Sequence, residues 1–265
     1  MVLSKNKKYQ YLFFSILCVY TIFNGGNSNI LIQLNFILIS LLFLYCLKDK
    51  NYILHFKIFY LKNRISIFFY TLFLFYLVFQ IIPLPIEYLK LFSPFKYDHI
   101  SELSTNIQYS SISLSPSNSF FQILNFISLL ILVFILKMIF YTNKHKNRLF
   151  FFLTFIGAFA SCVAVYFYLI GNPDFWIIKN INKSAATGFF ISRAVFSCFL
   201  TMCFFSGIEY LKMIDRYRKN DADVFFNKIY IRIFLLFITI GIITSFSKIG
   251  NFLFISLITL YILQT

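Results

Sequence analysis

Charged side chains are scarce in this chain of 265 residues: Asp, Glu, Lys and Arg make up 12% of it, against about 25% in typical soluble domains. Hydrophobic residues make up 60%, and they are gathered in long runs. A helix needs about 20 apolar residues to cross the hydrocarbon core of a bilayer. The composition therefore excludes an ordinary soluble domain and predicts an all-α, polytopic transmembrane helix bundle without a separate soluble domain.

Metal-binding and nucleic-acid-binding patterns are missing as well. None of the five cysteines belongs to a CxxC or Cys/His spacing, and all five fall within apolar runs, where a free Cys behaves as a small hydrophobe. The formal net charge is +15, but no aromatic-basic module of a nucleic-acid-binding protein accompanies it. We therefore expect no metal site and no nucleic-acid partner, with the lipid bilayer as the surrounding medium.

Apolar runs occur eight times along the chain, and we expect each of them to be a membrane segment. The runs are Tyr9–Phe23, Ile30–Leu47, Ile65–Ile82, Phe120–Tyr141, Leu149–Ile170, Phe189–Leu211, Ile231–Phe246 and Phe252–Leu263. The last run is too short for a full span, so we expect a truncated copy of a longer protein. Within residues 1–265 we expect a single integral membrane region, whose fifth helix packs through small residues such as Gly157, Ala158, Ala160 and Ser161.

The distribution of Lys and Arg predicts the orientation of the chain. If the N-terminus is cytoplasmic and the segments alternate, 17 of the 24 Lys and Arg residues fall in cytoplasmic segments, six fall in outside segments, and Lys137 lies near an inner helix end. Positive charge is retained on the cytoplasmic side of membrane proteins. The asymmetry therefore predicts a cytoplasmic N-terminus.

Two outside segments follow from this orientation, residues 83–118 and residues 171–188. The first opens with prolines that end the third helix, and Ile86–Phe92 has the pattern of a short interfacial helix. The second contains Asp174, which we interpret as a solvated turn residue, and Trp176, an ordinary interface anchor.

Three motifs occur in a fixed order on the predicted outer side. The first consists of Pro83–Pro85 (PLP), Leu91–Pro94 (LFSP) and Ile112–Pro116 (ISLSP); the second is Gly188–Ser197 (GFFISRAVFS); the third is Thr244–Gly250 (TSFSKIG). Together they resemble the Pro-Leu-Pro, Gly-Thr-Phe-x-Asn-Arg-Asn-x-Phe-Ala and Thr-x-Ser-Arg-x-Gly motifs of the O-antigen ligase and O-antigen polymerase superfamily. The resemblance runs from about Ile65 to the end of the chain.

This resemblance implies a membrane glycosyltransferase of polysaccharide or lipopolysaccharide biosynthesis, in the inner membrane of a Gram-negative bacterium. Its donor would be a glycan on a polyprenyl-pyrophosphate carrier, and its acceptor another glycan or a lipid. The donor carries its own leaving group, so no cofactor is expected. Cations at the periplasmic face would bind the pyrophosphate, which points first to Arg193 and then to Lys248. The family's acceptor-activating base is expected beyond residue 265, so the catalytic residue stays unassigned.

Several residues depart from the family pattern and leave other interpretations open. Ser192 and Ala194 replace the asparagines that flank the arginine, and Lys248 replaces an arginine, although Lys and Arg differ at phosphate sites. Arg193 could instead extend to the interface from inside a helix end, and Lys248 could be an ordinary turn lysine. Asp221-Ala222-Asp223 resembles the Asp-x-Asp of sugar-nucleotide transferases, but its predicted cytoplasmic loop is rich in charge.

Three other functions are compatible with a chain of this composition. A different class of polyprenyl-linked glycosyltransferase would need a long acidic first outside loop, whereas residues 24–29 are short and hold no acid. A transporter or flippase for lipid-linked sugars would be expected to contain inverted repeats or broken helices. A truncated copy could also be inactive.

Overall fold

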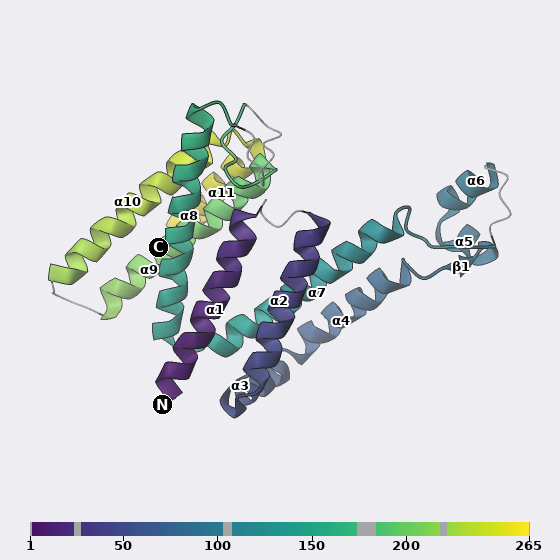
Figure 1. Cartoon of the computed structure of the whole chain (residues 1–265), viewed down its shortest axis with the longest axis horizontal. Coiled ribbons are helices and arrows are strands. Elements are labelled where there is room, and N and C mark those ends of the chain that lie inside the picture. The colour runs from purple at the N-terminus through teal and green to yellow at the C-terminus, as the bar shows by residue number, and fades with distance from the viewer. Residues whose placement is uncertain (1, 24–27, 103–107, 174–183, 218–221, 265) are drawn as a thin grey trace. The chain divides into compact units, whose positions relative to one another are not determined.

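The computed structural model describes residues 2–23, 28–102, 108–173, 184–217 and 222–264. In these residues the chain forms eleven α-helices and one two-stranded antiparallel sheet, which confirms the all-α prediction (Figure 1). The chain divides into two compact units. We call Met1–Leu31 with Ile139–Thr265 the terminal unit, and Ile32–Met138 the central unit.

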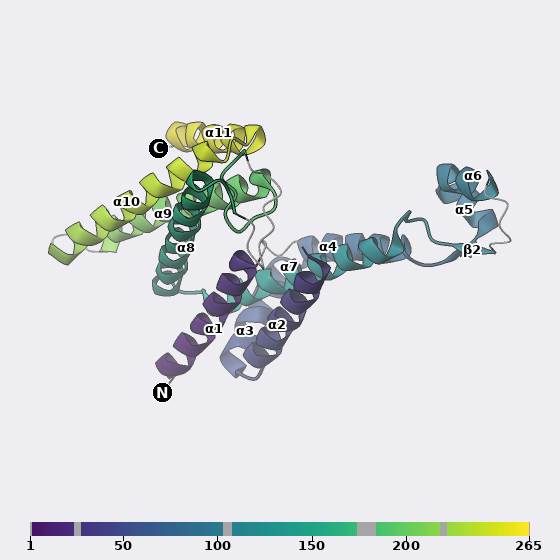
Figure 2. The same cartoon turned by 45° about the horizontal axis from the view of Figure 1, so that its top comes forward.

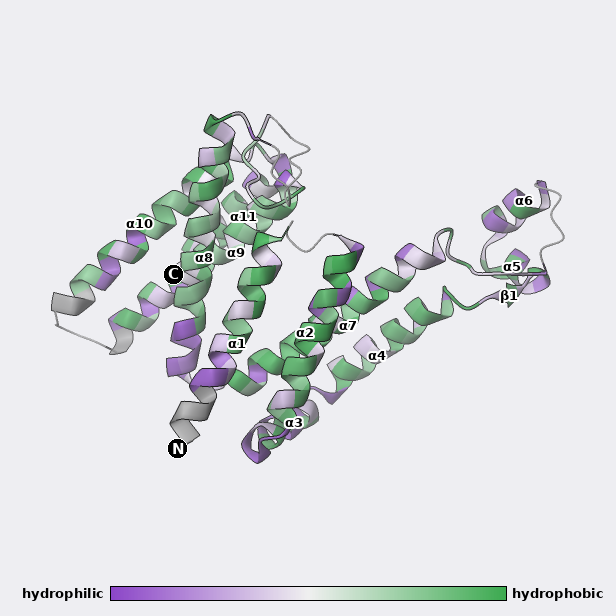
Figure 3. Ribbon diagram, in the orientation of Figure 1, coloured by the Kyte–Doolittle hydropathy of each residue, from purple (hydrophilic) through white to green (hydrophobic). Residues whose placement is uncertain are grey.

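Five helices are long and apolar enough to cross a membrane: α2 (Asn29–Leu47), α7 (Pro116–Ile139), α8 (Asn143–Leu169), α9 (Arg193–Tyr217) and α10 (Ala222–Thr244). A sixth span is possible if α3 (Lys50–Lys62) and α4 (Arg64–Phe79), which are bent by 85° at Asn63, form one crossing. Hydrophobic residues cover these helices, while hydrophilic residues gather in α3 and at the start of α8 (Figure 3). The chain is therefore a multi-pass membrane protein.

The two remaining predicted segments lie on helices that are not both long enough and apolar enough to cross a membrane. The first run lies on α1 (Val2–Ile22), which carries three lysines in its first turns. The last run lies on α11 (Lys248–Gln264), which is apolar but has only 17 residues. Every predicted apolar run thus overlaps a helix, whereas the number of spans stays a prediction.

Small residues pack the helices of the terminal unit. Helices α8, α9 and α10 contact one another, and α11 contacts α9 (Figure 1). A Cβ atom on Gly157 of α8 would overlap the side chain of Cys203 in α9, and one on Gly241 of α10 would overlap Ser161 in α8. The predicted small residues Gly157, Ala158, Ala160 and Ser161 are all buried, as expected. Backbones that approach this closely gain van der Waals contact, which drives helix association in lipid.

In the central unit, phenylalanine rings lie at the contacts between helices. The ring of Phe134 in α7 lies 6.5 Å from that of Phe43 in α2, and 5.1 and 5.7 Å from those of Phe56 and Phe59 in α3. Residues 32–138 contain no glycine and no alanine. Rings of this size keep the backbones apart, so helix contact here depends on side-chain tips.

The segment between α4 and α7 forms a small folded element beyond the ends of these two helices (Figure 2). Its parts are β1 (Leu84–Pro85), α5 (Ile86–Phe92), α6 (Pro94–Glu102) and β2 (Tyr109–Ser110), with β1 paired to β2. Helix α5 has the predicted bounds, and Leu89 on it is fully buried. The Lys96 amine donates hydrogen bonds to the carbonyls of Ser111 and Ser113, and burial lowers the pKa of this amine.

Candidate functional site

The second and third sequence motifs meet at one end of the terminal unit. Gly250, near the start of α11, lies against Ser197 in the second turn of α9: a Cβ atom on Gly250 would overlap both the Cβ and the Oγ of Ser197. Ser197 is fully buried there. We call this end, where residues 185–197 meet residues 244–250, the motif end.

Serine hydroxyls build the turn between α10 and α11. Ser245 Oγ donates to the Ile242 carbonyl at 2.6 Å, and Ser247 Oγ accepts from the Gly250 amide at 3.1 Å. The first bond satisfies a carbonyl at the end of α10, and the second caps the start of α11. Between them Phe246 has a positive φ of 46°. The side chains of the Ser-x-Ser sequence thus reverse the chain within a few residues.

Residues 185–190 pack against α8, the end of α10 and the start of α9. Asn172 Nδ2 donates to the Ala185 carbonyl at 3.1 Å, and the Ala186 amide donates to the Thr244 carbonyl at 3.1 Å. Gly188 has a φ of 55°, and its added Cβ would lie 2.9 Å from the Cβ of Ala164 in α8. This position therefore requires glycine for both its backbone conformation and its space.

The sixth apolar run does not become helical where the sequence places it. The run predicts a segment from Phe189, but α9 begins at Arg193. The Phe190 amide bonds to the Thr187 carbonyl in a turn, and the Phe190 ring packs 5.5 Å from that of Phe196. Hydrophobicity alone predicts a helix for these residues, whereas they fold back on the helix that follows. Arg193 is consequently the first residue of α9 rather than a residue inside it.

The two predicted pyrophosphate-binding residues occupy equivalent positions. Arg193 begins α9 and Lys248 begins α11, and both side chains are exposed. Among the described residues, neither side chain has a hydrogen bond, ion pair or cation–π contact. A cation gains nothing from the positive end of a helix dipole, but an anion bound there would interact favourably with both the cation and the helix start. The motif end can therefore bind an anion.

Two buried polar atoms, one in the motif end and one directly after it in the sequence, were not predicted. Thr187 Oγ1 and Asn251 Oδ1 are buried and make no hydrogen bond with the described part of the chain. Each stands beside a glycine of one motif, Gly188 and Gly250 respectively. A hydroxyl and an amide oxygen in such positions can bond to water or to a polar ligand.

The first motif belongs to the central unit, and the structure holds its pieces together there. The strand that contains Leu84 and Pro85 pairs with β2, and Lys96, two residues after Pro94, binds the carbonyls that precede Pro116. The Ser113 amide also donates to the Gln80 carbonyl at the end of α4, at 3.0 Å. This motif therefore shapes the segment between α4 and α7.

Other polar residues considered from the sequence fall outside a site or outside the described residues. Asp174, Trp176 and Asp221 are not among the described residues, and the side chain of Asp223 is not described either. Glu209 binds Lys212 at 3.3 Å, so it acts as an ordinary helix ion pair. In the described ranges no three His, Cys, Asp or Glu side chains form a metal-binding group.

Sequence reasoning identified both cations but not the contact that links their motifs. Ser197 and Gly250 each look ordinary in the sequence, because only the crossing of α9 and α11 makes their small size necessary. Comparison of the chain with protein-family models, with curated proteins and with solved structures finds no match.

Proposed function

We propose that this protein transfers a glycan from a polyprenyl-pyrophosphate carrier to an acceptor, as an O-antigen ligase or polymerase does. One observation carries the proposal: two motifs about 50 residues apart in the sequence meet at Ser197 and Gly250, and each supplies an exposed cation at the start of its helix. The motif resemblance gives the substrate class, and the contact gives a physical reason for the two motifs to act together.

The chemistry requires a site that binds pyrophosphate as it leaves. The bond between the anomeric carbon of the glycan and the pyrophosphate oxygen breaks, and an acceptor hydroxyl forms the new bond to that carbon and loses its proton. Negative charge grows on the leaving pyrophosphate, so cations near its oxygens stabilise the transition state. Arg193 and Lys248 would serve in this way. No described residue is assigned as the base that takes the proton.

The proposal includes a topology of eight membrane segments with a cytoplasmic N-terminus, in a bacterial inner membrane, and a motif end that faces the periplasm. The Lys and Arg asymmetry supports it. A contact within the terminal unit agrees with it: Arg148 Nη1 donates to Gln10 Oε1 at 3.1 Å, so α1 and α8 start at the same end. A first and a fifth segment must do so when segments alternate.

A transporter or flippase for lipid-linked sugars is the second candidate, and the bend between α3 and α4 favours it. Broken helices line the substrate sites of many transporters, and this pair is bent by 85°. However, Lys50, Lys57 and Lys62 lie on α3 itself, a charge content that suits the membrane surface better than the bilayer midplane. We therefore rank this function below glycan transfer.

The test uses the full chain in proteoliposomes that contain a fluorescent glycan on polyprenyl pyrophosphate and an acceptor glycan. Two quantities are measured, release of polyprenyl pyrophosphate and movement of the intact donor across the bilayer. The variants are Arg193→Ala, Lys248→Ala and, as a matched control, Arg64→Ala. Arg64 is also an exposed arginine at the first residue of a helix, α4, but it lies in no motif.

Glycan transfer predicts polyprenyl-pyrophosphate release by the unaltered chain, reduced about tenfold or more by Arg193→Ala, since hydrogen bonds to charged groups contribute about 1.5–3 kcal/mol. Arg64→Ala should release it at the unaltered rate. Movement of intact donor without release would indicate the transporter instead. Neither release nor movement would mean that this chain is inactive.

A further inference from the structure

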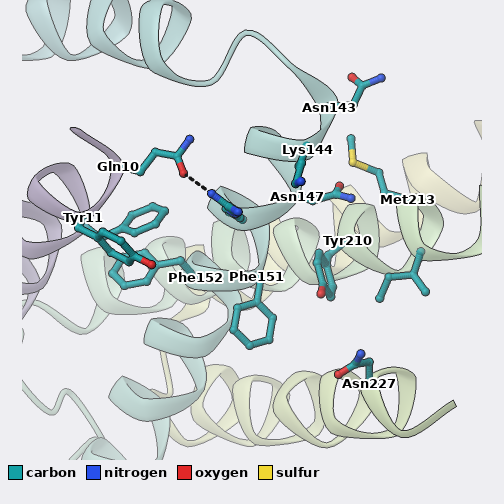
Figure 4. Close-up of a pocket in the computed structure, with 13 residues that line it drawn as sticks. Gln10, Tyr11, Asn143, Lys144, Asn147, Phe151, Phe152, Tyr210, Met213 and Asn227 are labelled. Atoms are coloured by element: carbon teal, nitrogen blue, oxygen red, sulfur yellow. Dashed lines mark hydrogen bonds between the residues drawn. The ribbon is translucent and has the colours of Figure 1, made fainter. Parts of the chain in front are cut away.

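A second polar region lies at the opposite end of the terminal unit, and the proposed function does not use it. A cavity of about 720 Å³ opens between the middle of α1, the start of α8, the last turns of α9 and the first turns of α10 (Figure 4). Such a volume lies within the usual range for small-molecule sites, about 300–1,000 Å³. We call it the basal cavity.

The charges of the basal cavity are all of one sign. Lys144 and Arg148 line it, and no Asp or Glu is among its described lining residues. The two carboxylates of the neighbouring helix α9 are already bound by lysines, because Glu209 pairs with Lys212 and Asp215 pairs with Lys228. Uncompensated cations in a partly enclosed space attract an anion more strongly than fully exposed cations do, because the surroundings screen the charge less.

Apolar side chains form the other part of the lining. The rings of Phe14 and Phe152 stack at 4.1 Å between α1 and α8, and the ring of Phe151 lies 5.5 Å from that of Tyr210 on α9. In Figure 4 the rings of Phe151 and Phe152 lie below the side chains of Asn143 and Asn147, and Asn227 lies below Phe151, so the rings line the wall between polar groups. The lining therefore suits a molecule with a charged head and an apolar tail.

Gln10 gives the basal cavity a built polar wall. Its side chain is only 2% exposed, and its Oε1 accepts the hydrogen bond from Arg148 Nη1 at 3.1 Å. Its Nε2 is buried and has no hydrogen-bond partner among the described residues, and the same holds for Asn147 Oδ1. Both atoms are covered by protein atoms, and rotation of the two amides would turn one donor and one acceptor into the cavity beside the guanidinium. Buried groups of this kind are normally satisfied, so a ligand that bonds to both would fit.

We propose that the basal cavity binds an anionic phospholipid whose headgroup carries a hydroxyl, such as phosphatidylglycerol. The phosphodiester accepts bonds from Arg148, Lys144 and the Gln10 amide, and a headgroup hydroxyl donates to Asn147 Oδ1. The acyl chains lie along the phenylalanine rings. Basic pockets between transmembrane helices are known to bind anionic headgroups.

This site is independent of glycan transfer, because the length of α8 separates it from the motif end. The basal cavity lies at the start of α8, at Lys144 and Arg148. The motif end instead packs against the other end of the same helix, where Gly188 lies against Ala164. Neither cation of the motif end lines the basal cavity, so loss of lipid binding and loss of glycan transfer can be measured separately.

The test is native mass spectrometry of the full chain released from detergent with equal amounts of phosphatidylglycerol and phosphatidylcholine. The variants are Lys144→Gln and Arg148→Gln, with Lys146→Gln as the matched control. Lys146 lies on the same turn of α8 and is exposed, but it does not line the cavity. Because Arg148 also holds Gln10, the Lys144 variant tests the cavity without disturbing that bond, and size-exclusion chromatography checks the folding of each protein.

We expect the unaltered chain to retain phosphatidylglycerol in preference to phosphatidylcholine. One lost cation should lower that retention about fivefold, the effect of about one Lys or Arg at a charged membrane surface, while Lys146→Gln retains it fully. Equal retention of both lipids, or an equal loss in all three variants, would overturn the proposal. Full displacement of the lipid by millimolar inorganic phosphate would also overturn it, because the cavity would then be a site for free phosphate.

Discussion

Helices in the central unit meet through phenylalanine rings, whereas helices in the terminal unit meet through glycine, alanine and serine in addition to such rings. Every glycine and every alanine of the chain lies outside residues 32–138. In the terminal unit a Cβ atom added to Gly157, Gly241 or Gly250 would overlap a side chain of another helix. In the central unit, by contrast, α4 has no buried residue at all in the described structure.

This difference indicates that the terminal unit is better suited than the central unit to hold a site in fixed geometry. Lipid tails are as apolar as a leucine side chain, so burial of apolar surface does not by itself hold helices together in a bilayer. Close backbone contact between small residues does so, and it leaves little freedom for movement. The motif end lies among contacts of this kind, and the basal cavity borders them through α8, α9 and α10, while α1 meets α8 through the rings of Phe14 and Phe152.

The largest expected effect comes from filling the contact between α9 and α11. Gly250→Val would place two methyl groups where Ser197 already lies. Overpacking costs about 1–3 kcal/mol, and we expect a value near the upper end because a turn and a helix crossing resist movement on both sides. The thermal unfolding midpoint of the purified protein in detergent measures the loss.

A double-mutant cycle separates this contact from a general effect of valine. Gly250→Ala and Ser197→Gly are made singly and together. If the two residues are in contact, Ser197→Gly should restore part of the stability that Gly250→Ala removes. Strictly additive losses would mean that the contact between the two motifs does not form.

The second effect concerns Gly188, where both backbone and space are restricted. Gly188→Ala should lower stability by about 2 kcal/mol, because a positive φ costs an alanine about 1–2 kcal/mol and the new Cβ would crowd Ala164 in α8. Gly171→Ala is the matched control: its φ is 90°, but nothing lies within 4 Å of its added Cβ. The φ of 90° at Gly171 lies outside the left-handed α region and costs alanine at least as much as the φ of 55° at Gly188. A larger fall of the midpoint for Gly188→Ala would therefore come from crowding, and a smaller fall would contradict a role for crowding.

Much of the fold could be predicted from the sequence. The apolar runs are long enough to indicate membrane helices by their length alone, without a helical periodicity. All eight runs overlap helices, and the predicted helix Ile86–Phe92 has its observed bounds. The sixth apolar run begins at Phe189, four residues before α9 begins at Arg193, since hydropathy cannot distinguish a helix from a buried turn of the same composition. Phe189 and Phe190 are apolar because they pack against neighbouring helices, not because they are helical.

The candidate sites were less predictable. Arg193 and Lys248 could be proposed from motifs, but their equivalent positions depend on where two helices begin. The basal cavity had no signal at all: Lys144 and Arg148 looked like ordinary cytoplasmic charges, and Gln10 lies in a different helix from both. Contacts between distant segments of the chain are set by packing, which one sequence does not reveal.

A smaller effect should follow from loss of the lysine that stabilises the segment between α4 and α7. Lys96→Met removes two hydrogen bonds, to the Ser111 and Ser113 carbonyls. A net hydrogen bond contributes about 1 kcal/mol, so amide hydrogen exchange in residues 108–113 should become several-fold faster. Lys90→Met is the control, since the Lys90 amine only lies over the Tyr97 ring at 5.7 Å. The same acceleration in both variants would contradict a specific role for Lys96.

The smallest effect on stability is expected for a ring at the helix contacts of the central unit, which tests the comparison of the two units directly. Phe134→Leu removes ring contacts with Phe43, Phe56 and Phe59, yet we expect it to lower stability by only about 0.5–1 kcal/mol. Each aromatic pair contributes about 0.5–1.5 kcal/mol beyond its buried area, but most of this is recovered because leucine and lipid fill the space that the ring leaves. The thermal midpoint should therefore fall much less than for Gly250→Val. A loss as large as that of Gly250→Val would mean that ring packing holds the central unit as tightly as small residues hold the terminal unit, because only close, specific contact makes a bilayer helix sensitive to a change in volume.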